Sequence, residues 1–216
     1  MKIAWNLGLG DAIACAAIVA KLANKNDVVE IPCWKHNEIS VKSFFINYAN
    51  VKIVTFIDVN DYNNWALVAD LKIGHYGNSP QLESEDFVQW FYRQAGMDIS
   101  EKDKYCPILS SSLNIAQQKK LPTEYQFVHH DFLRGFEISQ KKLNSQMVAH
   151  FAFNESLSIL SYMKILIGAK EIHCIDSSFI HLVECLPTTG KLFYHKYARP
   201  NSPDYKYIKK EWENLN

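Results

Sequence analysis

A strand-like segment at residues 2–6 leads through two glycines, Gly8 and Gly10, straight into an apolar helix expected at residues 12–23. Glycines at such a junction let the backbone turn sharply and let a ligand approach it closely. Asp11 follows the second glycine and puts a carboxylate at the positively polarised start of the helix. This carboxylate fits a catalytic base or a hydroxyl-binding group better than a phosphate cradle. We therefore expect a functional loop at this junction.

The same loop falls short of the dinucleotide-binding pattern G-x-G-x-x-G. Ile13 stands at the position of the third glycine, and Asp11 occupies the place where a pyrophosphate would lie. An NAD-type oxidoreductase remains an alternative, because Glu30 lies about twenty residues beyond Gly10, where such folds bind the ribose. The pattern nevertheless favours a different ligand for this loop.

Apolar segments that alternate between strand-like and helical periods predict parallel α/β sheets along the chain. The expected strands after the first are residues 28–33, 51–57, 66–73, 125–129, 147–151, 171–175 and 191–195. The further expected helices are residues 39–48, 85–95 and 156–168, and one that begins at Ser177 or Ser178 and stops at Pro187. The predicted fold class is α/β, with two Rossmann-like lobes whose parallel sheets face a cleft.

A charged stretch rich in Ser, Gln and Lys interrupts this alternation and marks the expected domain boundary. We predict an N-terminal lobe at residues 1–106, a linker at 107–122 and a C-terminal lobe at 123–216. Residues 1–106 carry 10 Lys/Arg against 13 Asp/Glu, and the remainder carries 13 against 10, so the net charge is zero. This balance disfavours a generic nucleic-acid binder. It suits an anionic ligand that is held mainly by the second half.

Five cysteines lie far apart and form no C-x-x-C pair, so neither a zinc site nor a disulfide framework is indicated. Met1 leads into the first strand without a hydrophobic leader. The longest apolar stretch, residues 12–20, is about half the length of a membrane span. We expect a soluble, cytoplasmic protein with buried free thiols and no metal site. The oligomeric state stays open.

A second candidate site lies at residues 171–181, where a strand ends at Asp176 and a helix follows. Ser177 and Ser178 form the turn between them, and His181 follows about one helical turn later. Unpaired backbone N–H groups at this helix start make an anion site at the carboxyl end of a strand. The alternative is a helix N-cap with a packed histidine.

A third candidate site follows the strand at residues 125–129. The loop contains His130, Asp131, Arg134 and Gly135. A guanidinium group is a planar, permanent cation suited to phosphate, and the glycine lets the loop bend toward a ligand. The alternative is an ordinary polar loop with an Asp131–Arg134 ion pair. Parallel strands would present this loop and the previous one at the same edge of the sheet.

Residues that follow the last expected strand leave two interpretations open. His195, Tyr197 and Arg199 could reach a nucleotide base or ribose, and a structural role is equally compatible with their positions.

Together, the Gly-x-Gly-Asp start and the Asp-Ser-Ser-x-x-His turn resemble heptosyltransferase-like glycosyltransferases of the GT-B fold. The resemblance implies that Asp11 is the catalytic base and that the donor diphosphate is held by Asp176, Ser177, Ser178 and His181. The whole chain is also similar to uncharacterised glycosyltransferase-like proteins from viral, bacterial and environmental sequences. It is shorter than typical GT-B enzymes, and Ser178 stands where the family has a glycine.

The resemblance implies a metal-independent glycosyltransferase that moves a sugar from a nucleotide-sugar donor to a glycan or other hydroxyl acceptor, without a further cofactor. The N-terminal lobe would then be the acceptor side, and the C-terminal lobe would bind the nucleotide sugar. The expected nucleotide-sugar contacts are Gly8, Gly10, His130, Asp131, Arg134, Gly135, Asp176, Ser177, Ser178 and His181. The alternative from another class is a sugar-nucleotide or phosphate-binding protein without turnover.

Overall fold

The computed structural model describes residues 1–74, 86–105, 122–152, 157–199 and 209–216. The chain divides into two compact units. The N-terminal unit comprises residues 1–112 with 155–158, and the C-terminal unit comprises residues 113–154 with 159–216. The predicted linker, residues 107–122, lies outside the described residues except for Pro122. Each unit contains a parallel sheet and helices, as the alternating sequence predicts.

The described part of the N-terminal unit contains four short parallel strands. Strand β1 (Ile3–Ala4) pairs with β4 (Leu71–Lys72), and β2 (Val29–Trp34) pairs with β3 (Val51–Phe56). A parallel bridge between Lys2 and Glu30 joins the two pairs. The resulting order, β3-β2-β1-β4, puts the Gly8 loop at the carboxyl end of a central strand.

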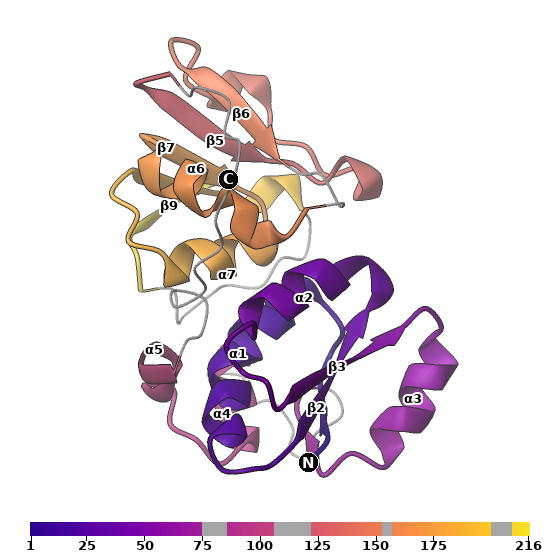
Figure 1. Cartoon of the computed structure of the whole chain (residues 1–216). Helices are drawn as coiled ribbons and strands as arrows, with labels where there is room; N and C mark the ends of the chain where they lie inside the picture. The colour runs from indigo at the N-terminus through magenta and orange to yellow at the C-terminus, as the bar shows by residue number, and fades with distance from the viewer. Residues whose placement is uncertain (75–85, 106–121, 153–156, 200–208) are drawn as a thin grey trace. The chain divides into compact units, whose positions relative to one another are not determined.

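Five helices accompany these strands: α1 (Leu9–Ala23), α2 (Glu38–Phe44), α3 (Val59–Leu67), α4 (Phe87–Gln94) and α5 (Glu101–Tyr105). Helices α1 and α4 lie on one side of β2 and β3, and α3 lies on the other (Figure 1). Helix α1 is buried over most of its surface, as its alanine-rich sequence predicts. It is the longest helix among the described residues, and none of these helices is long and apolar enough to cross a bilayer.

The expected strand at residues 66–73 is wrong over much of its length. Helix α3 continues to Leu67, and the strand is confined to residues 71–72. The helix begins at Asp58, whose carboxylate accepts the N–H groups of Asn60 and Asp61. The apolar side chains that suggested a buried strand are exposed, Leu67 by 70% and Val68 by 66%. Periodicity over so few residues does not separate a strand from a helix end.

The C-terminal unit is built on a five-stranded parallel sheet (Figure 1). Its strands are β5 (Tyr125–His129), β6 (Val148–Ala152), β7 (Glu171–Cys174), β8 (Lys191–His195) and β9 (Trp212–Leu215). Their spatial order is β6-β5-β7-β8-β9. Strand β5 therefore has a later strand on each side, and the direction of winding reverses between β5 and β7.

Two features of this unit differ from the sequence prediction. Strand β9 lies where the sequence analysis expects no strand, since its last expected strand is residues 191–195. Trp212 donates its indole N–H to Glu184 at 2.8 Å and so fixes β9 against α7. The expected helix at residues 156–168 is a short 3-10 turn, Ile159–Tyr162, followed by α6 (Met163–Gly168). Helix α7 (Ser178–Cys185) forms where predicted.

The cysteines are free thiols wherever the structure describes them. Cys15, Cys33 and Cys174 are buried, and Cys185 is half-buried. Burial raises the pKa of Cys33 to about 12, with a further contribution from Glu38. Burial also raises the pKa of Cys15 and Cys174, so these three buried cysteines stay protonated near pH 7. Cys106 lies outside the described residues.

We expect Gly190→Ala to destabilise the C-terminal unit by about 3 kcal/mol, at the upper end of overpacking costs. A Cβ atom at Gly190 would lie 2.3 Å from the carbonyl oxygen of Ala169, and that backbone carries the start of β7. Gly96→Ala is the control, because its left-handed backbone (φ +65) costs about 1 kcal/mol without any clash. Urea unfolding of both variants measures the difference, and equal losses would contradict the steric argument.

Candidate functional site

Two of the predicted loops meet at the reversal of strand order in the C-terminal unit. His129, the last residue of β5, lies directly opposite Cys174, the last residue of β7. The loops that follow these strands therefore leave the same edge of the sheet side by side. In open α/β sheets, ligands bind where the strand order reverses, because the connections on the two sides of that point lead away from each other and leave a crevice. The sequence prediction that parallel strands would bring these loops to one edge is confirmed.

The loop after β5 is a tight, doubly hydrogen-bonded turn. The backbone groups of Asp131 and Phe136 exchange two hydrogen bonds, of 2.8 and 2.9 Å, and close the loop. Inside it, residues Phe132–Arg134 form the 3-10 turn η4, and Gly135 ends the turn in the left-handed region at φ 76. The predicted role of Gly135 in bending the loop has this structural basis.

Arg134 is held by the carboxylate of Asp131. The carboxylate accepts the Arg134 backbone N–H at 3.1 Å and its Nε–H at 2.5 Å. Burial raises the pKa of Asp131, but these hydrogen bonds and the positive charge outweigh it and hold the pKa below its usual range. The ion pair foreseen as the alternative interpretation is therefore present. The Arg134 side chain remains 50% exposed and available to an anion.

The loop after β7 begins α7 in a standard capped geometry. The Ser177 hydroxyl accepts the backbone N–H of Phe179 at 3.3 Å, so Ser177 is the N-cap. The backbone N–H of Ile180 donates to the Ser177 carbonyl oxygen at 3.1 Å, so the first turn of α7 is closed by its own cap. The helix start carries the positive end of the helix dipole. Asp176 and His181 are both buried. The N-cap and the packed histidine foreseen as the alternative are therefore present, and anion binding at this turn stays a prediction.

Arg199 also reaches this edge, from the segment that follows β8. Its Nη1 group donates to the Asp176 carbonyl oxygen at 2.6 Å and lies 2.9 Å from the Asp176 carboxylate. The guanidinium groups of Arg199 and Arg134 each lie 5.6 Å from the ring of Phe136. Two arginines thus gather around one aromatic ring beside both loops. In the sequence, the only sign that Arg199 belongs to this edge of the sheet is its position shortly after a strand.

His129 is a residue that the sequence analysis did not select. Its ring packs 4.4 Å from that of Phe179 in the first turn of α7. Its Nδ1 atom is buried and has no hydrogen-bond partner among the described residues. Burial lowers the pKa of His129 to about 3, so the ring is neutral near pH 7. A buried polar atom left unpaired is uncommon and draws attention to this edge of the sheet.

A second buried group of histidines lies within the same sheet. His173 and His195 are joined by a 2.9 Å hydrogen bond; His173 faces Glu171 at 3.4 Å, and His195 faces the Tyr197 hydroxyl at 3.2 Å. The Ser139 N–H donates to that hydroxyl. Because this N–H only donates and the carboxylate only accepts, both rings carry their proton on Nε2. These hydrogen bonds tie the segment before Arg199 to β7, which fits the structural role that the sequence analysis left open.

In the N-terminal unit, Asp11 lies in the first turn of α1, after β1. A Cβ atom at Gly8 would lie 2.6 Å from the Asp11 carboxylate, so this carboxylate occupies the space that a side chain at residue 8 would fill. Gly8 is therefore required for a close approach by Asp11 itself. Gly10 lies within α1 and has a helical backbone. Half-buried Asp11 faces the helix dipole that stabilises its negative charge.

The position of Glu30 argues against the dinucleotide alternative. Glu30 lies near the start of β2, beside Lys2 in the register and 4.0 Å from its ammonium group. The Gly8 loop follows the end of β1. Glu30 is therefore at the opposite edge of the sheet from Gly8 and does not make the ribose contact that this alternative requires.

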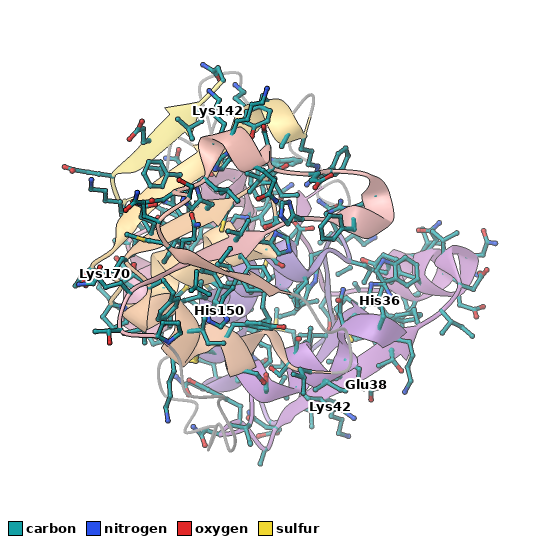
Figure 2. The ribbon with its side chains drawn as sticks, turned by 90° about the horizontal axis from the view of Figure 1, so that it is seen from above. His36, Glu38, Lys42, Lys142, His150 and Lys170 are labelled. Atoms are coloured by element: carbon teal, nitrogen blue, oxygen red, sulfur yellow. The ribbon has the colours of Figure 1, made fainter. Side chains whose placement is uncertain are left out.

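A further set of charges follows β2 in the N-terminal unit. Glu38 forms ion pairs with Lys35 and, at 2.6 Å, with Lys42, and Figure 2 shows Glu38 and Lys42 together on α2. Hydrogen bonds from these two lysines lower the pKa of Glu38. These side chains satisfy one another at the surface, which is typical of a solvated helix face.

No protein-family model matches the chain, and no curated protein matches it. Among solved structures, E. coli heptosyltransferase WaaC with ADP-2-deoxy-2-fluoro heptose is similar at a TM-score of 0.53 and 13% identity, over 100% of this chain and 93% of that chain. The chain has a heptosyltransferase-like GT-B fold. E. coli heptosyltransferase WaaC with ADP is also similar, at a TM-score of 0.48 and 12% identity, over 94% and 89% of the two chains.

The GT-B fold confirms the predicted class, an α/β protein with parallel sheets in two Rossmann-like units. The roles assigned to Asp11, Arg134 and the Ser177 turn stay predictions. Among the residues that the structure describes, no three His, Cys, Asp or Glu side chains are grouped so that they could hold a metal ion.

Acid is expected to destabilise the fold in part through His129. Its pKa is about 3 in the folded chain and about 6.5 when unfolded, so below pH 6.5 the unfolded state binds the extra proton. The stabilising contribution is complete above pH 6.5 and is lost as the pH falls toward 3. His129→Leu should reduce the loss of unfolding free energy between pH 7 and pH 5 by about 2 kcal/mol. Urea unfolding at both pH values measures this, and an unchanged pH dependence would contradict it.

Proposed function

We propose that this protein is a glycosyltransferase that takes a sugar from a nucleotide-sugar donor and transfers it to a hydroxyl acceptor without a metal ion. The observation that supports it best is the meeting of Arg134, Arg199 and the start of α7 where the strand order reverses. Cations and helix-start N–H groups at such a position suit a diphosphate. The heptosyltransferase-like fold supports the same class of donor.

In the proposed reaction, the acceptor oxygen bonds to the anomeric carbon of the sugar while the bond from that carbon to the diphosphate breaks. The leaving diphosphate gains negative charge. Arg134, the N–H groups of the Ser177–Ser178 turn and His181 stabilise this charge, which a divalent cation does in other enzymes. Arg199 contributes a second guanidinium, and its bond to the Asp176 carbonyl keeps the turn in place.

Asp11 is proposed to accept the proton that the acceptor hydroxyl releases. The Asp11 carboxylate lies close to the Gly8 backbone in the loop between β1 and α1. A general base must lie within hydrogen-bond reach of the proton that it accepts. The positive end of the α1 dipole interacts favourably with a negative charge at this position.

A second candidate function is binding of a sugar nucleotide without turnover. The observation that favours it is the pairing of both arginines with carboxylates, Arg134 with Asp131 and Arg199 with Asp176. These ion pairs give the loops at this edge a fixed structure, which suits binding and does not itself imply a catalytic step. A donor-hydrolysis and transfer assay separates the two functions.

Arg134→Ala should weaken binding of a nucleoside diphosphate by about 1.5–3 kcal/mol, the range for a charged hydrogen bond. The fold should survive, because the side chain is half exposed and lies in a loop. Isothermal titration with UDP, GDP and ADP measures the change. Lys164→Ala is the control, since it removes an exposed cation from α6 in the same unit. Equal affinity of the Arg134→Ala and wild-type proteins would remove Arg134 from the site.

Asp11→Asn should lower the rate of sugar transfer at least about a hundredfold, because an amide accepts no proton at neutral pH. Affinity for the nucleoside diphosphate should stay within about threefold, since Asn keeps the shape over Gly8 and the phosphates are assigned to the C-terminal unit. Steady-state transfer rates and titrations measure the two quantities.

Asp61→Asn is the matched control for Asp11→Asn. Asp61 also lies in the first turn of a helix, α3, and its loss removes only a dipole interaction worth under about 1 kcal/mol of stability. If Asp11→Asn and Asp61→Asn have the same small effect, Asp11 has no catalytic role. Markedly tighter nucleotide binding by Asp11→Asn would show that Asp11 faces the phosphates.

A further inference from the structure

Phe132 is an exposed aromatic side chain in the loop that follows β5. Its side chain is 63% exposed, although most large apolar residues of this unit are buried. One side of the ring is supported, because its centroid lies 4.7 Å from that of His130 at an interplanar angle of 32°. His130 is buried, and its Nδ1 atom accepts the Ile138 N–H at 2.9 Å. The ring of Phe132 thus rests on a fixed, buried base and remains open to solvent.

The turn that carries Phe132 also carries Arg134. The two residues lie in the same 3-10 turn, η4, which is closed by the Asp131–Phe136 backbone pair. Residues two apart in such a turn are separated by only about 4 Å along its axis. An exposed aromatic side chain and a half-exposed guanidinium are therefore carried by one closed loop, at the carboxyl edge of the sheet, where open α/β sheets bind ligands.

We propose that Phe132, supported by His130, is the stacking surface for the nucleobase of the donor nucleotide. This inference rests on the proposed function and adds the place of the base to it. Every nucleobase has a flat π-surface, and stacking on an aromatic side chain does not depend on the base. Arg134 in the same turn takes the phosphates, so one loop binds both ends of a nucleoside diphosphate.

Phe132 and Arg134 would contact chemically different parts of the ligand. An apolar ring attracts a base but not an inorganic anion, whereas Arg134 attracts both ligands. A nucleoside diphosphate and inorganic pyrophosphate therefore distinguish the contribution of Phe132 from that of the arginine. Stacking also predicts a broad choice of base, because Phe132 has no hydrogen-bonding group to select one.

The test is isothermal titration of the full chain with ADP, UDP, GDP and inorganic pyrophosphate. Phe132→Ala should weaken binding of all three nucleotides about five- to hundredfold and leave pyrophosphate binding unchanged. Phe132→Tyr keeps the ring and should bind nucleotides like the wild type. Val148→Ala is the control, because Val148 is an apolar residue of the same unit that is 54% exposed and lies on β6.

The possible outcomes separate this inference from the proposed function. If the wild-type chain binds nucleotides and Phe132→Ala binds them equally well, the stacking surface is wrong and the proposed function stands. An equal loss of pyrophosphate and nucleotide binding would mean that Phe132 only shapes the loop, which also overturns the inference. If the wild-type chain binds none of the nucleotides, the proposed function itself fails, and the inference fails with it.

Discussion

The parallel pairing of β5 with both β6 and β7 is the constraint on which the candidate site depends. Backbone hydrogen bonds fix His129 opposite Cys174, and this register brings two loops of distant sequence to one place. At this edge of the sheet, the loop after β7 supplies the start of α7, and the loop after β5 supplies the guanidinium group of Arg134. If the register of β5 shifted by one residue, the side chains at its end would exchange faces.

The charges at this edge are arranged so that the unliganded site is already ordered. Arg134 is paired with Asp131 of its own loop and Arg199 with Asp176 of the loop after β7, and burial lowers the pKa of His129 and His130. Little side-chain entropy is then left to lose when an anion binds. An anion that binds here, as proposed, must compete with the carboxylates for the arginines. This competition favours a ligand that carries more than one negative charge, such as a diphosphate.

Local signals in the sequence predicted most of the sheet, the start of α7 and the meeting of the two loops. Helix α3 and strand β9 escaped prediction because contacts distant in sequence stabilise them: Tyr62 donates to the carbonyl of Trp5, and Trp212 donates to Glu184. Arg199 reaches Asp176 across 23 residues, and no pattern in the sequence encodes that contact. Site residues that lie together after one strand could be predicted from the sequence. Site residues that come from several elements could be found only from the structure.

Ser139, Tyr197, His195, His173 and Glu171 are joined in that order by hydrogen bonds. Each group in this series donates to the next one, from the Ser139 N–H to the Glu171 carboxylate. Every donor in it is used by the next acceptor, so no member can change its protonation or leave without stranding a neighbour. The chain behaves as one cooperative unit that spans β7, β8 and the loop after β8. An apolar set can replace these residues only if all of them change together, so each is hard to substitute singly although none belongs to the loops of the candidate site.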